Sequence, residues 1–153
     1  MPNIIFNADD FGISAGVNQA IYKAHTEGVL NSTSIMITLK YVSDALNLAK
    51  KMPNLNIGLH ANLTNESSIL SSAEIPLLVD ENGKFKHGFV NLAILSVLHP
   101  RELKRQAKAE IKAQIDKALS YLVNYLSSGI CIKCKVKFIS CITINIKALH
   151  CIV

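Results

Sequence analysis

The chain has 153 residues, and half of them are apolar. This is about one domain of sequence with enough apolar side chains for a core. No run approaches the roughly 20 apolar residues of a membrane span, and the N-terminus lacks a basic-then-apolar secretory pattern, so we expect a cytoplasmic protein without a membrane partner. The net charge of +5 comes mostly from lysines after residue 128. A basic tail of this kind does not predict a nucleic-acid-binding face.

Alternating short apolar runs and helical patterns in the first 64 residues predict an α/β fold. Ser14 is a suitable N-cap for the first helix, and Gly28 suits its C-terminal end. A strand-helix-strand-helix-strand order favours parallel strands joined by right-handed crossovers. The predicted elements are a buried strand at 3–8, a helix from Ser14 to Gly28, a strand at 32–38, a helix at about 42–51 and a strand at 56–64.

The second half of the chain is predicted to contain a long irregular segment and a long helix. Residues 65–90 hold scattered polar residues and the turn-like sequence DENGK at 80–84. Residues 100–126 have the composition of a helix, with Pro100 allowed in its first turn. Its expected apolar stripe consists of Leu103, Ala107, Ile111, Ile115, Leu119 and Leu122.

Three ionisable residues lie at predicted strand ends. Asp9 and Asp10 follow the first strand, and His60 lies at or near the end of the third. The carboxyl ends of parallel strands are where α/β proteins bind ligands. Two adjacent carboxylates repel each other unless a cation or a shared proton compensates. A divalent ion held by one aspartate and His60 would leave the other aspartate as the base of a metal-assisted hydrolysis.

A structural interpretation of the same residues stays open at this point. An Asp-Asp pair can be a solvated turn, and a single histidine can be a hydrogen-bonded structural residue. Asn7, Asn62 and Thr64 flank the same strand ends. They suit either contacts to a metal ligand or sugar hydroxyl, or backbone capping in the turns.

The sequences NADDFG at 7–12 and GLHANLT at 58–64 together resemble the YdjC-like carbohydrate deacetylases, the group that includes chitooligosaccharide deacetylases. The resemblance extends from residue 3 to about 126. It implies a partial (β/α) barrel of the sugar-deacetylase type that removes acetyl groups from N-acetylated amino sugars with Mg²⁺ or Zn²⁺. It also implies Asp9 as the general base and Asp10 and His60 as metal ligands. If the chain associates with a partner chain, the assembly that we expect is a homodimer.

The resemblance stops near residue 128, so we interpret residues 1–128 as the N-terminal part of a longer deacetylase domain. The family has a third ligand, a histidine expected soon after Gly129, but the chain has none there before His150. We interpret 129–153 as a non-matching tail, with a frameshift as the simplest origin. The alternative is a zinc site, because Cys131 and Cys134 are in C-x-x-C spacing, followed by Cys141, His150 and Cys151.

Two other functions remain open from the sequence. A signalling receiver domain also has an acidic pair after its first strand and binds magnesium. It needs a phosphorylatable aspartate at the end of its third strand, where this chain has Gly-Leu-His. The other is a non-catalytic deacetylase remnant, since half a barrel would expose strand edges and apolar surface.

Overall fold

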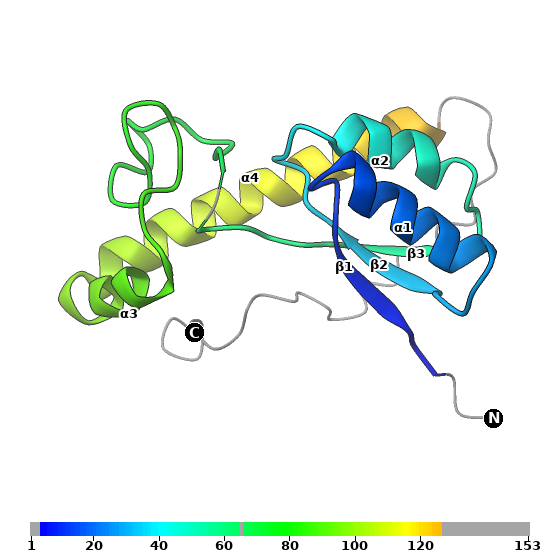
Figure 1. Ribbon diagram of the computed structural model, residues 1–153. Coiled ribbons are helices and arrows are strands. Elements are labelled where there is room, and N and C mark those ends of the chain that lie inside the picture. Colours follow the sequence, from blue (N-terminus) through cyan, green and yellow to red (C-terminus); the bar gives the residue numbers. More distant parts are fainter. Residues whose placement is uncertain (1–3, 65, 127–153) are drawn as a thin grey trace. The chain divides into compact units, whose positions relative to one another are not determined.

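The computed structural model describes residues 4–64 and 66–126 of the chain (Figure 1). These residues form two compact units. The first contains the chain up to His60 together with the end of the last helix from Ala118, and the second contains Ala61 to Lys117. No helix within the described ranges is long and apolar enough to cross a membrane.

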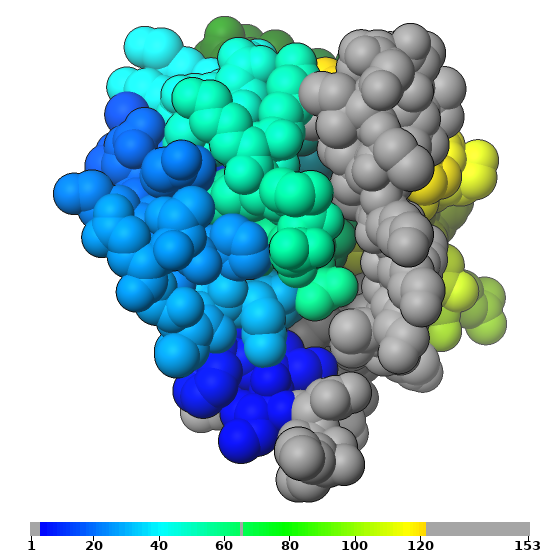
Figure 2. Space-filling model, turned by 90° about the vertical axis from the view of Figure 1, so that its right-hand side faces the viewer, coloured from blue at the N-terminus to red at the C-terminus, as the bar shows by residue number. Residues whose placement is uncertain are grey.

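The first unit is built on a three-stranded parallel sheet, as predicted. Strands β1 (Asn7–Phe11), β2 (Ser32–Ile35) and β3 (Asn56–Leu59) are adjacent in chain order. Helix α1 (Ala15–Thr26) connects β1 to β2, and α2 (Val42–Ala49) connects β2 to β3. Both helices lie on the same side of the sheet in Figure 1, and Figure 2 shows them side by side at the surface. The carboxyl ends of all three strands therefore meet at one edge.

Local sequence explains where the first helix begins and what the unit buries. Ser14 is the N-cap of α1, and its Oγ accepts a hydrogen bond from the backbone N–H of Val17 at 3.2 Å. This satisfies one of the donors that the first turn of a helix leaves unpaired. The core lies between the sheet and the two helices and consists of Phe11, Ile21, Ile35, Ile37, Val42, Ala45, Leu48, Ala49, Met52 and Leu55.

The predicted first strand is displaced along the chain. It was expected at 3–8 and buried, whereas β1 spans Asn7–Phe11 and the side chains of Ile4, Ile5 and Phe6 are exposed. Asn31 explains the shift: its Oδ1 accepts from the Phe6 N–H at 3.0 Å, and its Nδ2 donates to the Ile4 carbonyl at 2.9 Å. A side-chain amide therefore takes the backbone groups that a strand ladder would have used. Consequently, Asp9 and Asp10 lie within β1, not beyond its end.

The other two strands are shorter than predicted. Strand β2 ends at Ile35 instead of residue 38, and β3 ends at Leu59 instead of residue 64. Helix α2 ends at Ala49, two residues before its predicted end. The chain after β2 still packs into the core, since Met36 and Ile37 are buried. His60 directly follows β3, as the sequence indicated.

The second unit contains an irregular segment, helix α3 (Phe89–Leu98) and the first part of helix α4 (Pro100–Leu126). Helix α4 has the predicted bounds, whereas α3 was not predicted. The expected turn at 80–84 is present: Asp80 Oδ1 accepts from the N–H groups of Asn82 and Lys84, and Gly83 has φ +72°. The core of this unit consists of Ile75, Leu78, Val79, Phe85, Leu92, Leu103 and Ala107.

The buried face of α4 is more polar than the predicted apolar stripe. Leu103 and Ala107 are buried as expected, but Leu119 is exposed. Gln106, Glu110 and Gln114 are buried instead, at a spacing of four residues that places them on one helix face. Their side chains accept hydrogen bonds from the backbone N–H groups of Asn62, Ile69, Leu70 and Leu77. The backbone N–H groups of an irregular segment have no hydrogen-bond partners in a helix or sheet, and the polar side chains on this face of α4 accept their hydrogen bonds.

Candidate active site

A β-bulge in β1 brings the two aspartates together. The parallel pairing of β1 with β2 matches Ala8 with Thr33 and Phe11 with Ile35. Two residues of β1, Asp9 and Asp10, therefore lie opposite the single residue Ser34 of β2. Adjacent side chains of a regular strand point to opposite faces of the sheet. The extra residue removes this alternation locally, which is how bulges redirect side chains next to active sites.

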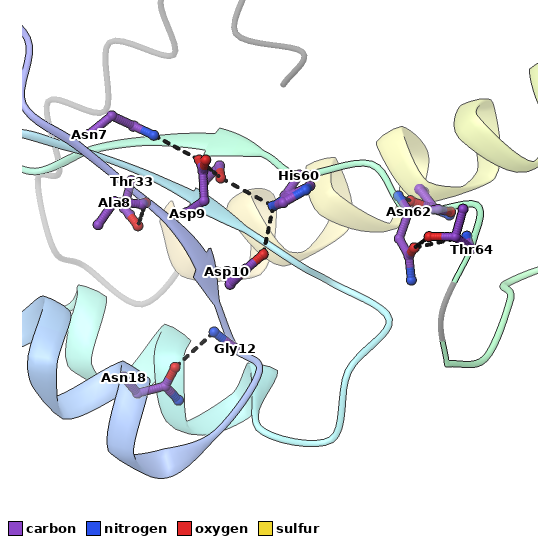
Figure 3. A network of polar contacts seen from close by, with 12 residues as sticks. Asn7, Ala8, Asp9, Asp10, Gly12, Asn18, Thr33, His60, Asn62 and Thr64 are labelled. Atoms are coloured by element: carbon purple, nitrogen blue, oxygen red, sulfur yellow. Dashed lines mark hydrogen bonds and ion pairs between the residues drawn. The ribbon is translucent and has the colours of Figure 1, made fainter. Parts of the chain in front are cut away.

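The bulge depends on an unusual backbone conformation at Asp10. Its φ is +67°, in the left-handed region that residues with a Cβ rarely adopt. Aspartate is one of the few such residues that visit this region routinely, because its short polar side chain hydrogen-bonds locally. Both aspartates consequently contact one polar cluster with Ser34 and His60, and Figure 3 shows Asn7, Asp9, Asp10 and His60 lying together.

Asp9 is held through one of its two carboxylate oxygens. Its Oδ1 accepts a hydrogen bond from Ser34 Oγ at 2.7 Å and another from Asn7 Nδ2 at 2.8 Å. Among the residues that the structure describes, none donates to Oδ2. The side chain of Asp9 is exposed, whereas Ser34 is buried. The carboxylate is therefore fixed from the protein side and open to solvent on the other.

Asp10 pairs with His60. Its Oδ1 lies 3.1 Å from His60 Nδ1, and the two side chains are 47% and 18% exposed, respectively. A carboxylate can only accept, so the ring nitrogen that faces it carries the proton in this arrangement. The backbone N–H of His60 donates to the Ile35 carbonyl at 2.8 Å, which fixes the histidine relative to the end of β2.

The turn after β1 is attached firmly to both helices. Gly12 has φ +102°, and a Cβ at this position would lie 3.1 Å from the Met36 carbonyl oxygen. Its N–H donates to Oδ1 of the buried Asn18 at 2.8 Å. Asn18 Nδ2 in turn donates to the Tyr41 carbonyl and to Asp44 Oδ2. This network holds the bulge against α1 and the start of α2.

The chemistry of Asp10 and His60 fits a divalent cation. A carboxylate oxygen and an imidazole nitrogen are common zinc ligands, and the carboxylate also suits magnesium. A metal bound here would take the place of the hydrogen bond between these two atoms. Within the described ranges no three His, Cys, Asp or Glu side chains form a group that could hold a metal.

The structure brings together Asp9, Asp10, His60 and Asn7, which the sequence singled out as candidates, and adds Ser34, which it did not. Strand β2 has the sequence STSI, and no local pattern distinguishes Ser34 from its hydroxyl-bearing neighbours Ser32 and Thr33. Asn62 and Thr64 contact each other instead: Asn62 Oδ1 accepts from the Thr64 N–H at 3.1 Å, as in an Asx-turn. The third histidine ligand and the zinc alternative concern residues after 128, which lie outside the described residues.

The family model described as YdjC-like protein matches residues 3–125. The chain belongs to the YdjC-like carbohydrate deacetylase family. It is 38% identical over 120 residues to a carbohydrate deacetylase of Thermoanaerobacter pseudethanolicus, covering 78% of this chain and 46% of that protein. It is 40% identical over 108 residues to a carbohydrate deacetylase of Brevibacillus brevis, covering 71% and 42%. The chain thus spans somewhat less than half the length of these relatives.

A solved structure gives the same assignment of fold. It is a protein of Enterococcus faecalis V583 whose suggested role is cellobiose-phosphate cleavage. The TM-score is 0.64 at 35% sequence identity, and the match covers 76% of this chain and 43% of that one. This likeness confirms the predicted α/β fold with parallel strands. The match covers only part of the solved structure, so this YdjC-like chain has part of that fold. The family also favours a deacetylase over a receiver domain.

Proposed function

We propose that the chain carries the metal and base residues of a hydrolase that removes acetyl groups from N-acetylated amino sugars such as chitooligosaccharides. The bulge in β1 is the observation that supports this most strongly. It brings Asp9 and Asp10 opposite one serine and places Asp10 3.1 Å from His60. A strained backbone kept at a polar cluster is typical of functional sites. The names of the relatives supply the reaction class, carbohydrate deacetylation.

In this proposal the two aspartates have different tasks. Asp10 and His60 hold Mg²⁺ or Zn²⁺, which when bound polarises the acetyl carbonyl and lowers the pKa of a water. Asp9 is the general base and takes a proton from the attacking water through Oδ2, the oxygen without a described donor. Water adds to the amide carbon, the proton that Asp9 has taken passes to the sugar nitrogen as the C–N bond breaks, and the products are acetate and the protonated amine of the sugar. Asn7 and Ser34 hold Asp9 during the proton transfer.

The test combines acetate release with metal binding. Acetate release from diacetylchitobiose is followed for the 153-residue chain with Mg²⁺ or Zn²⁺, and metal affinity is measured by calorimetry. We expect Asp9→Asn to lose at least about a hundredfold in rate, the lower end for removal of a general base, and to bind metal nearly normally. Asp10→Asn and His60→Ala should lose metal binding. Asp116→Asn is the matched control, since Asp116 is an exposed residue of α4 that pairs only with Lys112 among the described side chains.

Two results would contradict the proposal. An Asp9→Asn variant as active as the unchanged chain would remove Asp9 from the reaction. Metal binding without acetate release by the unchanged chain would favour the non-catalytic alternative, in which the site is inherited but does not turn over.

A further inference from the structure

Ser34 contacts both Asp9 and His60 in the candidate site. It is the one β2 residue opposite the two-residue bulge, and the residue is 2% exposed. Its Oγ lies 2.7 Å from Asp9 Oδ1 and 3.5 Å from His60 Nδ1. The same hydroxyl therefore contacts the residue proposed as base and the residue proposed as metal ligand.

The single hydroxyl proton of Ser34 goes to Asp9. A carboxylate has no proton to give, so the 2.7 Å contact requires the serine to donate. His60 Nδ1 carries the proton that faces Asp10, so Ser34 can only accept from it, and 3.5 Å makes that contact the weaker one. Asn7 Nδ2 donates to the same oxygen of Asp9 at 2.8 Å. Two donors on Oδ1 restrict the rotation of this carboxylate, and no described residue donates to Oδ2.

We propose that Ser34 is a positioning residue that separates the roles of the two adjacent aspartates. It holds Asp9 by Oδ1, so that this carboxylate presents Oδ2 as a base instead of turning toward His60 to become a ligand. Asp10 alone is then left to pair with His60. This inference rests on the proposed function, because it explains how neighbouring carboxylates of one bulge can do different work.

Thr33 provides a matched control. It is the preceding residue of β2, is 1% exposed, and donates from Oγ1 to the Ala8 carbonyl at 2.7 Å. Its side chain points to the opposite face of the sheet from that of Ser34. Thr33→Val and Ser34→Ala each remove one buried hydroxyl with a 2.7 Å hydrogen bond. Only the second removes a contact to Asp9.

The kinetic test compares these variants on diacetylchitobiose with saturating metal. Loss of a hydrogen bond to a charged group predicts that Ser34→Ala lowers kcat about tenfold or more. KM and the metal dissociation constant should stay within about twofold, and Ser34→Thr, which keeps the hydroxyl, should recover most of kcat. Thr33→Val should leave kcat within about twofold. Equal losses in Ser34→Ala and Thr33→Val would show a structural role only and overturn the proposal, as would an unchanged kcat in Ser34→Ala.

A second readout does not depend on activity. The side-chain carboxyl ¹³C resonance of Asp9 and the side-chain amide of Asn7 are recorded in the metal-free chain. Both should shift in Ser34→Ala and remain in place in Thr33→Val. If the unchanged chain releases no acetate, the proposed function fails for this chain, and the positioning of Asp9 by Ser34 is judged by these resonances. Resonances that do not move in Ser34→Ala would overturn it.

Discussion

Because Asp10 has a left-handed backbone conformation, we expect glycine to give a more stable protein than alanine at this position, the reverse of the usual order. In most strand and helix interiors, glycine is less stable than alanine by about 0.5–1 kcal/mol, because it loses more backbone freedom on folding. At φ +67° a Cβ costs roughly 1–2 kcal/mol, and glycine avoids this cost. Asp10→Gly and Asp10→Ala both lose the contact to His60, so that contact cancels in their comparison. We expect Asp10→Gly to be more stable than Asp10→Ala by about 1 kcal/mol.

Hydrogen exchange in the metal-free chain measures this difference. The backbone N–H of Met36 donates to Phe11 and that of His60 to Ile35, both at 2.8 Å, so their exchange reports opening of the sheet beside the bulge. A difference of about 1 kcal/mol corresponds to roughly fivefold slower exchange in Asp10→Gly than in Asp10→Ala. Gln19 is the control, because it is exposed in the interior of α1. In α1, backbone amides should exchange more slowly in Gln19→Ala than in Gln19→Gly, which is the usual order of stability for these two residues in a helix. The same order at Asp10 would refute the strained bulge.

Two further predictions concern α4. Glu110 is fully buried and accepts hydrogen bonds from the backbone N–H groups of Ile69 and Leu70 at 2.9 and 3.0 Å. Glu110→Ala should therefore lower the unfolding free energy of the second unit by about 3 kcal/mol, measured by urea unfolding. A loss below about 1 kcal/mol would contradict this, and Ala113→Gly serves as a control substitution in the same helix. A hydrogen bond from Arg105, and then one from Gln106, lowers the pKa of Glu102 to about 2. A lowered pKa stabilises the folded state above the unfolded value of 4.5 and loses this contribution as the pH falls through about 2. Glu102→Gln should therefore reduce the dependence of the unfolding free energy on pH between pH 4.5 and about 2. The effect should be small because the side chains of Glu102 and Arg105 are both exposed. An unchanged pH dependence would contradict the lowered pKa of Glu102.

Elements set by local chemistry were predictable from the sequence. Ser14 has the side chain of an N-cap and caps α1, and the long helical pattern after Pro100 becomes α4 with the expected bounds. The chain order of strands and helices predicted the parallel sheet. Asp9, Asp10 and His60 were singled out as candidates because their residue types and predicted strand-end positions are typical of metal-assisted hydrolysis; the structure places them in one cluster, and their roles stay predictions.

Features that depend on distant residues were not predictable in the same way. The displacement of β1 results from the side chain of Asn31, 25 residues from Phe6 along the chain. The bulge at Asp10 requires a register with β2 that no local pattern specifies, and Ser34 acquires its place only through that register. The buried side chain of Gln114 pairs with backbone 52 residues away, so helical periodicity alone predicted the buried face of α4 only in part.

The central claim is that Asp10 and His60 hold a divalent ion while Asp9, in the same bulge, does not. Calorimetric titration with Mg²⁺ tests it most directly, because a hard cation avoids the cysteine thiols near the end of the chain. We predict saturable binding that Asp10→Asn abolishes and Asp9→Asn preserves within about threefold, with asparagine chosen because it tolerates the left-handed backbone. Equal Mg²⁺ affinity in the unchanged chain and in Asp10→Asn would contradict the account.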